Sequence, residues 1–201
     1  MRLGMAARAT RPEEGSAPDN KSDLSWRERL LGAVFVLLVI AAQTYWMGPA
    51  IILLSGGLAV AYAVWAFGRW KNDVRAILPM YLLAIAVQCL HFTEEYVTGF
   101  QRQFPRLLES QWSDPQFVTF NLLWLAAFGL AGLGVYRRLP LAYLIAFFLA
   151  LIGGVGNGAS HLLLSAMHRG YFPGLITAPL CLAVGIVLLK RLFFGAPVGE
   201  A

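Results

Sequence analysis

The chain has 201 residues, of which 58% are hydrophobic and only 13% are charged. Soluble domains carry about 25% charged residues, so this composition excludes an ordinary water-facing surface. The net charge of +5 does not indicate binding to nucleic acid, because the basic residues form neither a single run nor a single face. They separate apolar segments instead, which is typical of an all-α protein that crosses a lipid bilayer several times.

The first 24 residues are polar and predict a disordered N-terminal tail. No apolar stretch follows Met1, so we expect no secretory signal peptide. The segment Ser25-Trp-Arg-Glu28 then has the pattern of a capping box, with Ser25 as the N-cap. We therefore predict one transmembrane domain over residues 25–195, followed by a short C-terminal tail over residues 196–201.

The apolar run from Leu30 to Phe67 is nearly 40 residues long, whereas a single span needs about 20 residues. Gln43, Thr44 and the pair Gly48-Pro49 interrupt this run. We therefore predict two helices joined by a tight turn.

Caps and polar breaks divide the rest of the chain. Asn72 or Asp73 is expected to cap a third helix, and Ser113-Asp-Pro-Gln116 begins a fourth with proline in its first turn. Residues 99–115 form a polar connection with aromatic side chains, which we expect to lie at the membrane interface. The six predicted helices cover residues 26–46, 49–68, 73–98, 115–135, 139–168 and 173–194.

Lysine and arginine are distributed unevenly between the two sides of this predicted bundle. Thirteen of the 16 lie on the side of the N-terminus, and only Arg102, Arg106 and Arg169 lie on the other side. Cytoplasmic loops of membrane proteins carry an excess of basic residues. We therefore expect about six spans with both termini in the cytoplasm, which in a bacterial host places the chain in the cell (inner) membrane.

One polar cluster stands out against the apolar background, in the outer half of the third predicted helix: Cys89-Leu-His91-Phe-Thr-Glu94-Glu95-Tyr96. A charge at the bilayer centre costs about 2.5–3.5 kcal/mol on insertion scales, so such a residue usually faces a partner or a cavity. Glu94 and Glu95 follow His91 by three and four residues and share its helix face. Gln88 extends this face by one turn. The alternative is a helix end at which both glutamates simply reach water.

A second polar stripe follows one face of the fifth predicted helix. It includes Asn157 and His161, and Gly154 and Gly158 form a GxxxG pattern that lets another helix approach closely. The third and fifth helices run in the same direction in the predicted topology, which brings His91 and His161 to similar depth. We therefore predict one shared site, with an interhelical hydrogen bond as the alternative role of His161.

Three motifs occur in order along the chain: His91-Phe-Thr-Glu94-Glu95, the later His161, and Tyr171-Phe-Pro173-Gly174. Together they resemble the HXXEE-domain family of small integral membrane proteins. The resemblance covers about residues 75–195 and implies that these residues form a single site. It implies no particular reaction, because the function of that family is not known.

Metal binding would relieve the charge of such a site. Catalytic zinc commonly takes three protein ligands and leaves one position open. His91, Glu95 and His161 are the predicted ligands, which leaves Glu94 as a general base for a bound water; helical geometry equally permits Glu94 as the ligand. Two histidines and a carboxylate also suit non-haem iron. The phenol of Tyr171 is expected to reach the site as a second catalytic group.

Gln88 and Asn157 lie near the predicted ligands along their helices, so we expect them to support those ligands. The preferred function is a metal-dependent hydrolase or oxidoreductase within the membrane. Its site is expected to open toward the outer face and to accept an apolar or lipid-like substrate. Two alternatives stay open: a cation- or proton-coupled transporter, and a structural membrane subunit whose polar stripe binds a partner helix.

Overall fold

The structure is a computed structural model that describes residues 23–196 of the chain. Every regular element within that range is a helix, as the composition predicts. The two predicted tails, residues 1–24 and 196–201, lie outside the described residues apart from positions 23, 24 and 196. Five helical segments of the described part are long and apolar enough to cross a membrane.

Eleven helical elements, several of them consecutive, make up the described chain. The elements η1 and η2 are short 3-10 helices, and η3 is a π-helix that joins α6 to α7. In chain order the elements are α1 (Trp26–Met47), η1 (Pro49–Ile51), α2 (Ile52–Phe67), α3 (Val74–Thr98), α4 (Phe100–Gln103), η2 (Pro105–Leu108), α5 (Asp114–Tyr136), α6 (Pro140–Phe148), η3 (Leu149–Gly156), α7 (Asn157–Met167) and α8 (Ala178–Phe194).

Side-chain caps fix the starts of three long helices where the sequence predicts them. Ser25 and Glu28 form the reciprocal hydrogen bonds of a capping box at α1. Asp73, rather than Asn72, caps α3 by accepting a hydrogen bond from the backbone N–H of Ala76 at 3.2 Å. Ser113 and its partner Gln116 cap α5 in the same way as at α1. Each cap satisfies backbone N–H groups that a helix start leaves without a partner inside the helix.

The last helix begins later than predicted, at Ala178 instead of residue 173. Residues 173–177 form a turn, in which Gly174 adopts the positive φ of 93°. An L-residue side chain is strained in that region, so glycine allows the chain to reverse there. As a result, this turn lies over one end of the bundle instead of extending α8.

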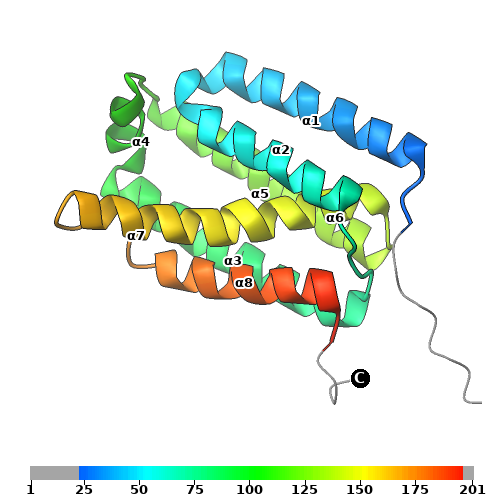
Figure 1. Ribbon diagram of the computed structural model, residues 1–201. Coiled ribbons are helices and arrows are strands. Elements are labelled where there is room, and N and C mark those ends of the chain that lie inside the picture. Colours follow the sequence, from blue (N-terminus) through cyan, green and yellow to red (C-terminus); the bar gives the residue numbers. More distant parts are fainter. Residues whose placement is uncertain (1–22, 197–201) are drawn as a thin grey trace, which may run out of the picture.

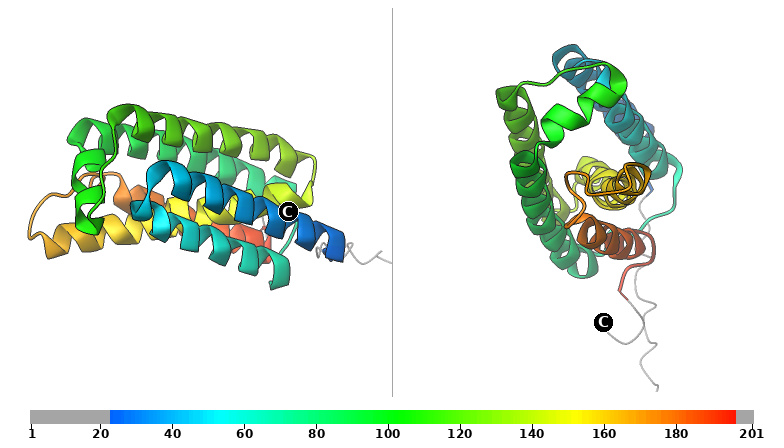
Figure 2. Two further views of the ribbon diagram at one scale, coloured as in Figure 1. Left: turned by 90° about the horizontal axis from the view of Figure 1, so that it is seen from above. Right: turned by 90° about the vertical axis from the view of Figure 1, so that its left-hand side faces the viewer.

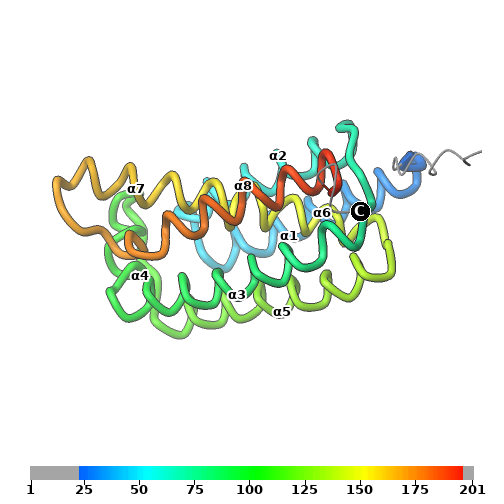
Figure 3. Tube along the Cα trace, turned by 90° about the horizontal axis from the view of Figure 1, so that it is seen from below, coloured from blue at the N-terminus to red at the C-terminus, as the bar shows by residue number. Residues whose placement is uncertain are grey.

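The helices pack lengthwise into an elongated bundle (Figure 1). The segment α6–η3–α7 runs through the centre, with the hairpin of α1 and α2 on one side and α8 on another. Helices α3 and α5 lie side by side along the remaining side (Figure 3). The end view in Figure 2 shows the short helix α4 crossing one end of the bundle.

The central helix is buried because other helices surround it. Residues 142–150 are buried without interruption, although most helices of a bundle bury one face only. The outer helices instead expose large apolar side chains such as Leu37, Leu130 and Val97. An apolar core inside an equally apolar outer surface is typical of a protein that contacts lipid, as the composition predicts.

Small residues bring α8 into close contact with this central helix. A Cβ atom on Gly154 would lie 2.5 Å from the Cα of Gly185, and one on Gly158 would lie 2.7 Å from the carbonyl oxygen of Ala178. The close approach that the GxxxG pattern predicts is therefore confirmed. This contact holds the start of α8 close to His161, which lies one turn after Gly158 in α7.

Candidate metal centre

His91, Glu95 and His161 converge at one buried point between α3 and α7. The Nε2 atoms of the two histidines are 3.2 Å apart. Oε1 of Glu95 lies 3.5 Å from Nε2 of His91 and 3.1 Å from Nε2 of His161. None of the three residues is more than 4% exposed. The three residues form a group that could hold a metal ion, in agreement with the predicted shared site.

The other ring nitrogen of His161 defines how this histidine faces the group. Its Nδ1 lies 2.6 Å from the carbonyl oxygen of Pro173, and a carbonyl oxygen can only accept a hydrogen bond. The proton of the neutral ring is therefore on Nδ1. This leaves the lone pair of Nε2 directed at the carboxylate of Glu95.

His91 is oriented in the same sense through a hydroxyl group. Its Nδ1 lies 2.7 Å from Oγ1 of Thr177, and that hydroxyl donates its only proton to Oε2 of Glu94. Oγ1 of Thr177 must then accept a hydrogen bond from Nδ1 of His91. The chain Glu94–Thr177–His91 thus places the lone pair of the second Nε2 on the same point.

With both imidazoles neutral, this arrangement assembles three electron-pair donors with no proton between them. A tetrahedral ion with bonds of about 2.0–2.1 Å separates its ligand atoms by about 3.3–3.4 Å. The observed separations of 3.1–3.5 Å bracket that value. Hydrogen bonds from the far nitrogen of each histidine are also the usual way in which metal-binding imidazoles are oriented. The donor set and its spacing therefore suit a cation.

Glu94 lies beside this group but takes no direct part in it. Its carboxylate accepts four hydrogen bonds: from the phenol of Tyr171, from the backbone N–H groups of Ile176 and Thr177, and from the Thr177 hydroxyl. The two N–H groups belong to the turn that leads into α8, where backbone donors lack helical partners. Glu94 therefore joins the end of α3 to the start of α8 and leaves neither oxygen without a donor.

The segment Tyr171-Phe-Pro173-Gly174 encloses the group from the side of that turn. Tyr171 donates to Oε1 of Glu94 at 2.7 Å, and Pro173 supplies the carbonyl for His161. A Cβ atom on Gly174 would lie 2.5 Å from the ring of His161, so only glycine fits there. Burial raises the pKa of the Tyr171 phenol, and the hydrogen bond to the Glu94 carboxylate raises it too. The phenol therefore keeps its proton at neutral pH and holds Glu94, as a neutral donor.

Gln88 and Asn157 were expected to support the ligands. The groups that hydrogen-bond to the two histidines are those of Thr177 and Pro173. Gln88 and Asn157 instead line a cavity. The sequence offered only a weak signal for Thr177, as a hydroxyl residue two positions before Pro179 at a helix start. The third histidine, His168, is exposed and lies outside the group, with Nδ1 2.9 Å from the carbonyl oxygen of Leu164.

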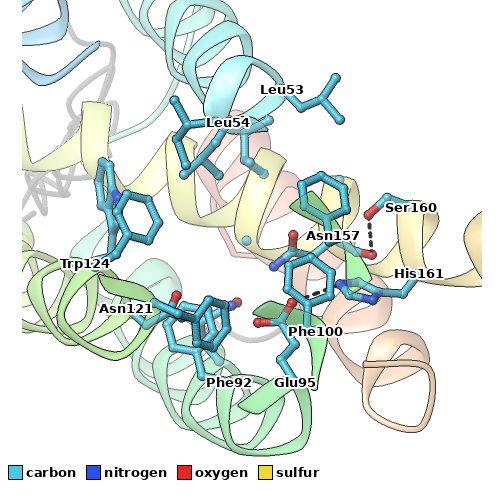
Figure 4. A pocket seen from close by; sticks show the side chains of 18 of the residues that line it. Leu53, Leu54, Phe92, Glu95, Phe100, Asn121, Trp124, Asn157, Ser160 and His161 are labelled. Carbon is cyan, nitrogen blue, oxygen red and sulfur yellow. Dashed lines mark hydrogen bonds and ion pairs between the residues drawn. The ribbon is translucent and has the colours of Figure 1, made fainter. Parts of the chain in front are cut away.

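The cavity opens directly beside the group and has a volume of about 420 Å³. Glu95 and His161 form part of its wall (Figure 4). Most of the remaining wall is apolar, with a high share of aromatic side chains: Phe92, Phe100, Phe104, Trp112, Phe117, Phe120, Trp124, Phe128 and Phe148. A concave, mostly apolar pocket of 300–1,000 Å³ with a few polar groups is typical of a small-molecule site.

Comparison with known proteins places the chain in one family. The family model described as "protein of unknown function with HXXEE motif" matches residues 82–188, which include both histidines and the glutamate of the buried group. No curated protein and no solved structure matches the chain. The match covers more than half of the chain and all three motifs of the site, so this protein belongs to the HXXEE family.

Proposed function

We propose that this protein is a metal-dependent membrane enzyme that acts on an apolar or lipid-like substrate. His91, Glu95 and His161 are the ligands. The observation that carries the proposal is the convergence of their three lone-pair atoms at 3.1–3.5 Å, with both Nδ1 atoms already used as donors. Buried electron-pair donors of this kind repel one another unless a cation lies between them.

The cavity supports an enzyme rather than a closed structural site. Two of the three ligands, Glu95 and His161, are part of the cavity wall, so a ligand position on that side would face bound substrate. Zinc there would activate a water for hydrolysis, and non-haem iron would support oxidation. Hydrolysis and oxidation would use the same protein ligands, so the identity of the metal distinguishes the two reactions.

Glu94 and Tyr171, the predicted catalytic pair, are better placed for a positioning role. Four hydrogen bonds occupy the Glu94 carboxylate, and the phenol of Tyr171 provides one of them. We propose that Glu94 acts on His91 through Thr177, as carboxylates commonly orient metal-binding histidines. Tyr171 then holds Glu94 in place.

We also propose the membrane topology of the sequence prediction, in which α8 is a sixth crossing of one domain over residues 25–195. Its 17 residues extend over about 26 Å at 1.5 Å per residue, and the hydrocarbon core is about 30 Å thick. With both termini cytoplasmic in the cell (inner) membrane, the predicted inner segments carry 13 of the 16 lysines and arginines. The metal centre then lies toward the outer face.

Elemental analysis of the purified protein tests the proposed metal. The wild type, loaded with zinc, iron or manganese, is expected to retain close to one equivalent, and His161→Ala is expected to lose it. His168→Ala is the matched control, because this histidine is exposed and outside the group. A wild type that stays metal-free after loading would exclude the metalloenzyme and favour a group that shares a proton, as in a proton-coupled transporter.

A further inference from the structure

Three carboxamide side chains face the cavity beside the metal centre. Gln88 comes from α3, Asn121 from α5 and Asn157 from α7. Their amide groups make no hydrogen bond to any other residue in the described range. Nδ2 of Asn121 is buried without a partner, in a side chain that is only 8% exposed. Figure 4 shows Asn121 and Asn157 on different helices around the cavity, with Glu95 near Asn157.

Unpaired amides at this depth point to a ligand. Buried polar groups in proteins nearly always have a hydrogen-bond partner, and lipid cannot supply one. Each amide offers both a donor and an acceptor. Three of them from three different helices therefore form a site for a group that carries oxygen.

The charge of the cavity wall restricts what that group can be. Glu95 is its only acidic residue, and no lysine or arginine contributes to it. A phosphate or carboxylate head group would find no cation from the protein and would face Glu95. A neutral hydroxyl, ester or amide group matches the three carboxamides, because it needs hydrogen bonds and no opposite charge.

Two exposed leucines of the cavity wall indicate where the rest of the ligand lies. Leu53 of α2 and Leu163 of α7 belong to the cavity wall, yet they are 65% and 61% exposed. Both therefore also belong to the apolar outer surface of the bundle. The cavity wall is therefore continuous with the lipid-facing surface at these two residues, so the apolar part of a ligand is expected to lie on this side.

We propose that the cavity binds a neutral, oxygen-bearing lipid-like molecule, such as a long-chain alcohol, ester or amide, with its oxygen on Asn121. If the protein is the proposed enzyme, this molecule is its substrate class, and that part of the proposal rests on the proposed function. Binding itself depends on the amides and the apolar wall, so it can be measured whether or not a metal is present.

Quenching of tryptophan fluorescence by brominated probes tests this directly, because Trp124 lines the cavity. The probes are 11-bromoundecan-1-ol, 1-bromoundecane and 11-bromoundecanoate at pH 9, which share a chain length and differ in the polar end. The alcohol is expected to quench saturably. The saturable quenching is expected to decrease in Trp124→Phe and to disappear when Trp112→Phe is added, because Trp112 lines the cavity as well. Asn121→Leu, similar in size but without the amide, is expected to weaken binding of the alcohol about tenfold.

Gln43→Leu is the matched control, because it removes a buried carboxamide that bonds to Ser55 and does not line the cavity. It is expected to bind the alcohol as the wild type does. Asn157→Leu serves as a second cavity variant if Asn121→Leu does not fold.

The outcomes separate this proposal from the metal. Equal binding of the alcohol and bromoundecane, preference for the carboxylate, or unchanged binding in the folded cavity variants would each overturn it. A metal-free wild type that still binds the alcohol through Asn121 would leave this site standing and exclude the metalloenzyme. A metal-loaded wild type with no preference for the alcohol would support the metalloenzyme and exclude this binding site.

Discussion

At the scale of single residues, the site depends on two hydrogen bonds that determine the orientation of two imidazole rings. The carbonyl oxygen of Pro173 accepts a hydrogen bond from Nδ1 of His161, and the hydroxyl of Thr177 accepts one from Nδ1 of His91. Without these acceptors either ring can carry its proton on Nε2, where it would occupy the position of a metal. The residues that prepare the site are therefore not the ligands alone.

Thr177→Val tests the hydroxyl, because valine keeps the shape of threonine and removes both hydrogen bonds. Metal affinity, measured by competition with a chelator, is expected to fall about 10- to 100-fold, as it does when a supporting group of a metal site is lost. Thr177→Ser retains the hydroxyl and is expected to bind nearly as the wild type does. Equal affinities for the valine and wild-type proteins would show that Thr177 does not orient His91.

At the scale of the helices, contact between α8 and the central helix brings the supporting residues to the ligands. Thr177 immediately precedes α8, whereas His161 belongs to α7. Just before α7, Gly154 of η3 approaches Gly185 of α8, where backbone lies against backbone. Contacts of this kind drive helix association in membranes, where the surrounding lipid is as apolar as the helices.

Gly154→Ala is expected to separate these helices, because the added Cβ would lie 2.5 Å from the Cα of Gly185. We expect a loss of about 1–3 kcal/mol of stability, typical of overpacking, together with weaker metal binding. Thermal unfolding in detergent and metal titration measure the two effects.

Gly129→Ala is the control for this change, because no atom lies within 4 Å of a Cβ added there. Alanine is favoured over glycine inside a helix, so this variant should be at least as stable as the wild type. If both variants unfold alike, the contact at Gly154 does not hold α8 in place.

At the scale of the whole molecule, the bundle encloses a cavity whose wall combines polar groups with a mostly apolar, aromatic lining. The polar groups are Glu95 and His161 of the metal group and the three amides. The ends of the molecule differ as well, because α4 and the turn before α8 cover one end only. The proposed topology places this covered end outside the cell.

Labelling of single cysteines tests that orientation in a background of Cys89→Ser and Cys181→Ala. A membrane-impermeant maleimide is expected to label Gly170→Cys, between α7 and α8, in intact cells. It is expected to label Arg137→Cys, between α5 and α6, only after the membrane is opened. The opposite pattern, or equal labelling of both positions in intact cells, would contradict the proposed topology.

The sequence by itself determined the all-helical fold and most helix boundaries. These features depend on local signals, which involve residues close together in the sequence. The signals are the length of the apolar runs, the capping residues Ser25 and Ser113, and the pair Gly48-Pro49. The pairing of His91 with His161 also followed from the sequence, because both histidines stand out in an apolar background and the topology gives them similar depth.

Only the tertiary structure decided what each polar residue of the site contacts. Helical spacing puts Glu94 and Glu95 on nearly the same face, yet packing of α8 directs Glu95 to the histidines and Glu94 to Thr177. The packing of the helices also leaves Asn121 of α5 facing a cavity. Such choices depend on groups that are more than 60 residues apart along the chain, and helix periodicity carries no information about partners at that distance.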